Sequence, residues 1–297
     1  MIFKTLLIVF MSSSLGTFSQ ASSLIRATLK PQQSIILDTV LNEISGLAVT
    51  EQYFWGVNDS GGKAKLYSFD KENGKLAQAV TINNALNIDW EDLAQDKDFI
   101  YIGDTGNNFA IRQSIDIYKV SKPALEALAK KNSSAGLKIN SQKLTLKYAD
   151  KQNILPQRKH NFDSEALVAV EDQLWLFSKN RQDYRTKLYL LDKNLIEQRV
   201  SPAASFAVQG LITAADYNTD TKQLLLLGYS KSSGFNGNFI WQLNIVDQLP
   251  DWRSAKRFAL KPDAQWESIK WLTNQQFMLA AEKSPRGKQT LSIFNLP

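Results

Sequence analysis

The sequence predicts an all-β protein, a five-bladed β-propeller of four-stranded blades. Two observations lead to this fold: a unit of short apolar strands recurs five times, and one strand-like segment near the start of the chain has no unit of its own. Repeats of about 40–50 residues with four short strands each are typical of propeller blades. A terminal strand contributed from elsewhere in the chain can then close the ring.

Each unit begins with a short apolar strand, followed by a turn and a second, strongly apolar strand. The first strands are "NEISGLAV", "DWEDLAQ", "DSEALVAV", "ITAADYN" and "QWESIKW". The second strands are "YFWGVNDSG", "FIYIGDTGN", "LWLFSKN", "LLLLGYS" and "FMLAAEKS". A polar loop and an alternating third strand follow in every unit, as in "KLYSFD" and "DIYKVS". Alternation of apolar and polar residues is the pattern of a half-buried strand.

The fourth strand is evident in three units, as "LAQAVTI", "QKLTLKY" and "AKRFAL", and is less clear in the third unit. The fifth unit ends with three strands, so we expect "LIRATLKPQQSIIL" to supply its outer strand and close the ring. A six-bladed ring is the alternative. Two inserts lie between Glu91 and Glu165: "SKPALEALAKKN", which is predicted to be one short helix, and the loop "ADKQNILPQRKHN". Neither has enough strands for a sixth blade.

Residues 1–21 have the features of a secretory signal peptide: a basic residue at Lys4, an apolar run and a small-x-small cleavage site ending at Ala21. An N-terminal anchor is the alternative, although the apolar run is too short to span a bilayer. We therefore expect residues 22–297 to form a single propeller domain in the periplasm or outside the cell.

The composition excludes several kinds of chemistry. The chain has 297 residues with no Cys, so it has no thiol nucleophile and no disulfide. Its one histidine, His160, cannot build a multi-histidine metal site. The net charge of +6 comes from scattered basic residues, which does not predict a nucleic-acid surface. Carboxylates, Lys, Arg and hydroxyl groups remain as the functional groups.

Carboxylates recur at two places in the repeat, the start of the innermost strand and the end of the second strand. These two places lie at the same face of a propeller, because the two strands run antiparallel. Ala214 takes the first place in the fourth unit. We expect a divalent cation, Ca²⁺, to be bound by Glu43, Glu91, Asp104, Glu165 and Glu267. We expect a ligand to contact Asp59, Arg112, His160, Lys179, Arg181 and Glu282.

A structural role is the alternative for these residues. A recurring glutamate can accept hydrogen bonds from backbone N–H groups of the next blade, and the basic residues can simply pair with the carboxylates. The sequence assigns no catalytic residue.

These motifs resemble those of exported bacterial propeller proteins that are mostly uncharacterised. The matching stretches include "NEISGLA", "WGVNDSGG", "DWEDLA", "YIGDTGNNFAIR", "HNFDSEAL" and "LWLFSKNR". More remotely, "FDSEAL" and "GDTGNNFAIR" are similar to motifs of phytase-like propellers, which are calcium-dependent phosphomonoesterases or presumed esterases. Those enzymes have six blades, and their full metal and phosphate motifs are not evident in this chain. The resemblance implies the propeller fold and offers phosphoester hydrolysis as a candidate activity.

The leading functional hypothesis is a binding protein for a divalent cation and a small anionic or sugar-like ligand. A calcium-dependent phosphoester hydrolase is the first alternative, with Arg112 and Lys179 binding phosphate. A metal-free glycosidase that uses a carboxylate pair is the second. A protein-interaction scaffold is the third. Oligomeric state is not predicted.

Overall fold

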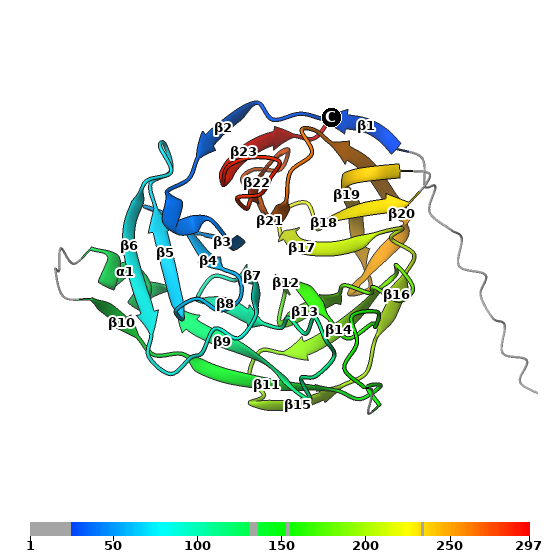
Figure 1. Ribbon diagram of the computed structural model, residues 1–297, viewed down its shortest axis with the longest axis horizontal. Coiled ribbons are helices and arrows are strands. Elements are labelled where there is room, and N and C mark those ends of the chain that lie inside the picture. The colour runs from blue at the N-terminus through cyan, green and yellow to red at the C-terminus, as the bar shows by residue number, and fades with distance from the viewer. Residues whose placement is uncertain (1–24, 131–135, 153–154, 233–234) are drawn as a thin grey trace, which may run out of the picture.

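The computed structural model describes residues 25–130, 136–152, 155–232 and 235–297 (Figure 1). Within these residues the strands form five sheets arranged as a ring around a central axis, so the five-bladed prediction is confirmed. The expected signal peptide, residues 1–21, lies outside the described residues. No helix in the described part of the chain is both long enough and apolar enough to cross a membrane.

Each blade has four strands in up-and-down order from the channel outward. Blade 1 contains β3 (Ile44–Val49), β4 (Phe54–Asn58), β5 (Lys65–Phe69) and β6 (Leu76–Ile82). Blade 2 contains β7 (Trp90–Gln95), β8 (Phe99–Asp104), β9 (Ile115–Ser121) and β11 (Gln142–Tyr148). Blade 3 contains β12 (Ser164–Val170), β13 (Gln173–Ser178), β14 (Thr186–Asp192) and β16 (Ala204–Phe206). Blade 4 contains β17 (Leu211–Asn218), β18 (Gln223–Ser232), β19 (Phe235–Val246) and β20 (Leu249–Leu260). Blade 5 contains β21 (Trp266–Trp271), β22 (Gln276–Ala281), β23 (Thr290–Asn295) and β2 (Gln33–Ile36).

The N-terminal segment closes the ring as predicted, but only with its second half. Strand β2 pairs antiparallel with β23, the last strand of the chain. The first half is a separate strand, β1 (Ile25–Leu29), which pairs parallel with β20 of blade 4. The two strands are divided at Pro31, which has no N–H to donate to a ladder.

Two further blades also carry a fifth, parallel strand at their outer edge. Strand β10 (Leu137–Ile139) pairs with β6, and β15 (Glu197–Val200) pairs with β11. The second pairing explains why the fourth strand of the third unit was unclear in the sequence. The most strand-like part of that segment joins blade 2, and blade 3 keeps only the three residues of β16.

The insert of blade 2 contains the predicted helix, α1 (Lys122–Ala129). The Ser121 hydroxyl accepts a hydrogen bond from the Ala124 N–H, and Pro123 lies in the first turn, where its missing N–H has no consequence. The core consists of five apolar clusters, each between two adjacent blades. Four tryptophans of the strands pack in these clusters between blades: Trp55, Trp175, Trp241 and Trp271.

Candidate functional site at the channel mouth

Every innermost strand has a β-bulge near its start, at one end of the ring's central axis. This end of the axis is called the channel mouth below. In blades 2, 3 and 5 the extra residue of the bulge is Glu91, Glu165 and Glu267. In blades 1 and 4 it is Ser45 and Thr213. A bulge re-aims the side chain of its extra residue, and bulges are frequent beside functional sites. The recurring glutamates are therefore held in a special backbone position that the repeat builds in all five blades.

The strand registers correct two alignments made from the sequence. Glu43 and Ala214 do not occupy the glutamate position, because the strand pairing places Ser45 and Thr213 there. Glu43 is instead equivalent to Asp89 and Asp163, two residues before each bulge. An alignment that assumes strict alternation of side chains along each strand does not identify the residue at the bulge.

Asp104 is also displaced by one residue from the position predicted for it. Asp104 pairs with Trp90. The residue of blade 2 that is equivalent to Asp59, Lys179 and Glu282 is Thr105, one residue later. The Asp104 carboxylate is fully buried and accepts hydrogen bonds from the Asp89 N–H (3.0 Å) and from Arg112 Nη1 (2.9 Å). Both contacts involve one oxygen, Oδ1, and keep Asp104 beside the mouth.

The backbone contacts between blades are made by other polar residues. The Ser45 and Thr213 hydroxyls donate to the backbone carbonyls of Trp90 and Trp266 in the next blade. The Asp92 carboxylate accepts from N–H groups of three blades. Among the described residues, no backbone N–H donates to the carboxylate of a bulge glutamate. Backbone hydrogen bonding, the first part of the structural alternative, therefore applies to Asp92 and to the hydroxyl residues rather than to the glutamates. Its second part, pairing with basic residues, applies to Glu165, which pairs with Lys179 and Arg181.

Carboxylates of two blades meet in one group that has no cationic partner. Asp59, Asp89 and Glu91 each place one oxygen within 4.8 Å of the others. Among the described residues, none of the three forms an ion pair with Lys or Arg. The Asn87 amide donates to the backbone carbonyls of Asn58 and Asp59 (3.0 and 2.8 Å), which ties the blade 1 loop to the start of blade 2.

A second carboxylate group is neutralised by two cations. Glu91 also lies within 4.8 Å of Asp163 and Glu165, by one oxygen of each. Lys179 forms an ion pair with Glu165, and Arg181 pairs with Asp163 and, at 3.6 Å, with Glu165. The basic residues predicted to hold a ligand are thus occupied by carboxylates of the mouth.

Burial and mutual repulsion raise the pKa of most of these carboxyl groups. Burial, followed by the charge of Glu165, raises the pKa of Glu91 well above its usual value. Burial raises the pKa of Asp89 to about 6 and that of Glu165 to about 8, the latter despite Lys179. Burial and the charge of Glu267 raise the pKa of Glu282 to about 9. These groups favour a proton or a bound cation over the free carboxylate.

The other predicted residues lie around the same mouth in less direct positions. Glu43 is exposed, and its charge contributes to the raised pKa of Glu282. His160 is buried, its Nδ1 accepts from the Phe162 N–H (3.1 Å), and burial lowers its pKa. Three residues of the mouth were not among the predicted site residues: Asp89, Asp163 and Gly106. The spacing of two residues between each aspartate and its glutamate was the available signal.

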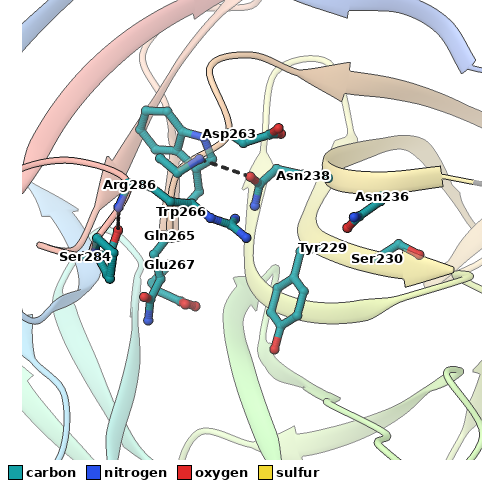
Figure 2. Close-up of a pocket in the computed structure, with 13 residues that line it drawn as sticks. Tyr229, Ser230, Asn236, Asn238, Asp263, Gln265, Trp266, Glu267, Ser284 and Arg286 are labelled. Carbon is teal, nitrogen blue, oxygen red and sulfur yellow. Dashed lines mark hydrogen bonds between the residues drawn. The ribbon is translucent and has the colours of Figure 1, made fainter.

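A cavity of about 380 Å³ opens beside the mouth, between blades 4 and 5 (Figure 2). Tyr229 of blade 4 and Glu267 of blade 5 border it. The Lys179 ammonium nitrogen lies 5.5 Å from the centre of the Tyr229 ring, which connects the cavity to the carboxylate groups.

Comparisons with known proteins bear on the fold. No protein-family model matches the chain, and no curated protein matches it in sequence. The chain is similar to the solved structure of an exo-β-1,3-galactanase from Phanerochaete chrysosporium with β-1,3-galactotriose, at a TM-score of 0.51 and 11% identity. That match covers 90% of this chain and 65% of the galactanase.

An exo-1,5-α-L-arabinanase from a bovine ruminal metagenomic library matches at a TM-score of 0.47 and 12% identity, over 85% of this chain and 93% of that one. A hydrazine synthase from Kuenenia stuttgartiensis matches at 0.42 and 11% identity, over 82% of this chain and 57% of that one. The chain thus spans less than two thirds of the length of the synthase and of the galactanase. At these identities the similarity shows the β-propeller fold alone, and it does not extend to the exported family that the motifs resemble.

Proposed function

We propose that the protein binds Ca²⁺ at the channel mouth through Asp59, Asp89 and Glu91. The observation that carries this proposal is the convergence of three carboxylates without a Lys or Arg partner among the described residues. Three carboxylates at this separation repel one another strongly in a partly buried place. A divalent cation removes the repulsion and uses the oxygens as ligands.

The chemistry of the group favours calcium over other metals. All three side chains offer oxygen, the donor that hard cations require, and Ca²⁺ accepts six to eight oxygen ligands in flexible geometry. Asp59 and Asp89 are half-buried, so water or a ligand can complete the coordination. Mg²⁺ demands a nearly ideal octahedron, which three carboxylates from two loops and a bulge supply less readily.

The pairing of the cations argues for binding rather than for phosphoester hydrolysis. Phosphate would have to displace Asp104 from Arg112 and Glu165 from Lys179, which are existing ion pairs. A neutral ligand, or an anionic ligand that coordinates the bound cation, does not have to displace these carboxylates from Arg112 and Lys179.

Glycoside hydrolysis is a second candidate, favoured by the different proton affinities of two nearby carboxyl groups. At neutral pH Glu165, with a pKa of about 8, holds a proton more firmly than Asp89, with a pKa of about 6. One carboxyl group that donates a proton and one that remains ionised are the pair that such enzymes need. The galactanase and the arabinanase act on carbohydrates by their names.

Isothermal titration calorimetry with Ca²⁺ tests the cation site on chelator-treated protein. We expect one site in the wild type and its loss in Asp89→Asn, whereas Glu72→Gln, an exposed acidic position in the loop between β5 and β6, should titrate like the wild type. An identical titration of Asp89→Asn and the wild type would reject the site. A screen with aryl glycosides tests the second candidate, and activity abolished by Glu165→Gln would support it.

A further inference from the structure

The cavity between blades 4 and 5 exists because blade 4 is longer than the other blades. Strands β18 and β19 have 10 and 12 residues, whereas β8 and β13 have 6 each. Beyond Tyr229, strand β18 has no partner in β17, and residues 230–232 pair only with residues 235–237 of β19. The hairpin therefore rises past the start of the innermost strand and forms a wall at the mouth.

The opposite wall comes from blade 5 and its connections. The β20–β21 loop contributes Asp263, Ala264 and Gln265, and the β22–β23 loop contributes Ser284, Pro285 and Arg286. Gly237 lies in the wall of blade 4 with a φ of 150°, a conformation that other residues rarely adopt. Long strands, a special backbone position and two loops thus combine to enclose the space between blades 4 and 5.

Most side chains that line the cavity are polar and can form hydrogen bonds. Amides come from Asn236, Asn238 and Gln265, carboxylates from Asp263 and Glu267, a guanidinium from Arg286 and a hydroxyl from Tyr229 (Figure 2). Asn238 Oδ1 accepts from the Ala264 N–H at 3.3 Å, which fixes the orientation of the amide. Among the described residues, neither Asn238 Nδ2 nor the Arg286 guanidinium makes a hydrogen bond or an ion pair, so both are available to a ligand.

This lining selects one class of ligand. An apolar molecule would leave the amide donors and the carboxylates without partners, which is costly in a partly enclosed site. An anion would meet the carboxylates of Asp263, which already pairs with Lys261 at 2.6 Å, and of Glu267, and the only basic residue of the lining is Arg286. A molecule with several neutral hydroxyl groups suits the lining, because each hydroxyl both donates and accepts.

We propose that this cavity binds one or two residues of a neutral saccharide. Its hydroxyl groups would donate to Asp263 and Glu267 and accept from Asn238 and Arg286. The cavity lies at the small end of the range of ligand pockets, about 300–1,000 Å³, which is appropriate for such a ligand. The inference rests on the proposed function and extends it to a ligand class, because Glu267 lies both in the cavity and at the mouth, where burial and the charge of Glu267 raise the pKa of Asp59. It does not require the cation itself.

Calorimetry with a sugar panel tests the inference. The panel contains neutral hexoses and their β-linked disaccharides, with glucuronate and glucosamine as charged comparisons, and each is titrated in calcium and in chelator. We expect at least one neutral sugar to bind at millimolar concentration or below, and Arg286→Ala and Asn238→Ala each to weaken it at least tenfold. Arg286 is exposed, so its truncation is a test that does not endanger folding. Asn244→Ala, an exposed asparagine near the other end of β19, should bind like the wild type.

The outcomes separate this inference from the cation site. Sugar binding in chelator supports the saccharide pocket even if no calcium site is found. Calcium binding without any bound neutral sugar overturns the saccharide pocket and leaves the cation site in place. Binding of only the charged sugars, or equal affinity in Arg286→Ala and the wild type, also overturns the inference.

Discussion

The backbone of Gly106 lies against the carboxylate of Glu91. A Cβ at residue 106 would come within 2.2 Å of Glu91 Oε1 and 2.3 Å of Asp89 Oδ2, distances that no real Cβ can adopt. The Gly106 N–H donates to the Asp89 carbonyl at 3.2 Å, and its carbonyl accepts from Arg112 Nη1 at 2.9 Å. The loop "GDTGNN" is therefore shaped around the carboxylates of the mouth and is more than a connecting turn.

Gly106→Ala should destabilise the fold and disturb the carboxylate group. Overpacking of this kind costs about 1–3 kcal/mol, and urea denaturation measures it. Gly62→Ala is the matched control in the corresponding loop of blade 1, because the nearest atom to its added Cβ is 3.6 Å away. Equal stability of the two variants would contradict the close approach.

Asp92→Ala should lower the free energy of unfolding by about 3 kcal/mol, because it leaves buried backbone donors without their acceptor. Asp92 accepts from the N–H groups of Leu93 (2.8 Å), Leu167 (3.0 Å) and Ala215 (3.5 Å), which belong to blades 2, 3 and 4. Thermal and urea unfolding measure the loss. Glu91→Gln, one residue earlier, should show no such loss in chelator, and a comparable loss there would assign Glu91 the structural role.

The metal-free protein should lose stability as the pH rises from about 5 to about 8. A carboxyl group whose pKa is raised on folding binds its proton more tightly in the folded state, so folding is favoured at low pH and that advantage fades as the pH approaches the folded pKa. The folded values of about 6 for Asp89, 8 for Glu165 and 9 for Glu282 set the range. Melting curves in chelator at several pH values measure the trend, and a melting temperature that rises with pH would contradict it.

Removal of β2 should open the ring, because β2 pairs with the last strand, β23, for example at Ile35 and Leu291. Without β2 the outer edge of β23 has no partner. An exposed strand edge also promotes aggregation. A chain that starts at residue 38 lacks both β1 and β2, whereas one that starts at residue 31 lacks only β1. We expect a large drop in melting temperature for the first and a small drop for the second. Similar melting of the two truncated chains would show that β2 does not close the ring.

The fold was predictable because the repeat is visible in residue types. Apolar strands such as "FIYIGD" and "LWLFS" recur with polar loops between them, and burial on both faces of a blade requires that pattern. The division of the N-terminal segment at Pro31 and the departure of β15 to blade 2 were not predictable. Both depend on which outer edge lies nearby in space, and the local sequence does not record that.

The residues of the mouth were predictable in part, because some of them recur at the same place in the repeat. Glu91 and Glu165 were identified because both begin an innermost strand. The registers that place Ser45 rather than Glu43 at the bulge, and Thr105 rather than Asp104 opposite Asp59, depend on strand pairing, which residue types alone do not specify. The cavity was missed because it results from extra length in β18 and β19, two strands whose sequences contain no acidic residue.

The most direct test of the account is the melting temperature of wild type and Glu91→Gln, each with millimolar Ca²⁺ and with chelator. A ligand at 100 times its dissociation constant stabilises the folded state by about 2.7 kcal/mol, which shifts the midpoint by several degrees in a domain of this size. We predict that calcium raises the melting temperature of the wild type, that Glu91→Gln loses the response, and that the two chelated proteins melt alike or the variant melts higher. A wild-type melting curve that is the same in calcium and in chelator would contradict the proposed cation site.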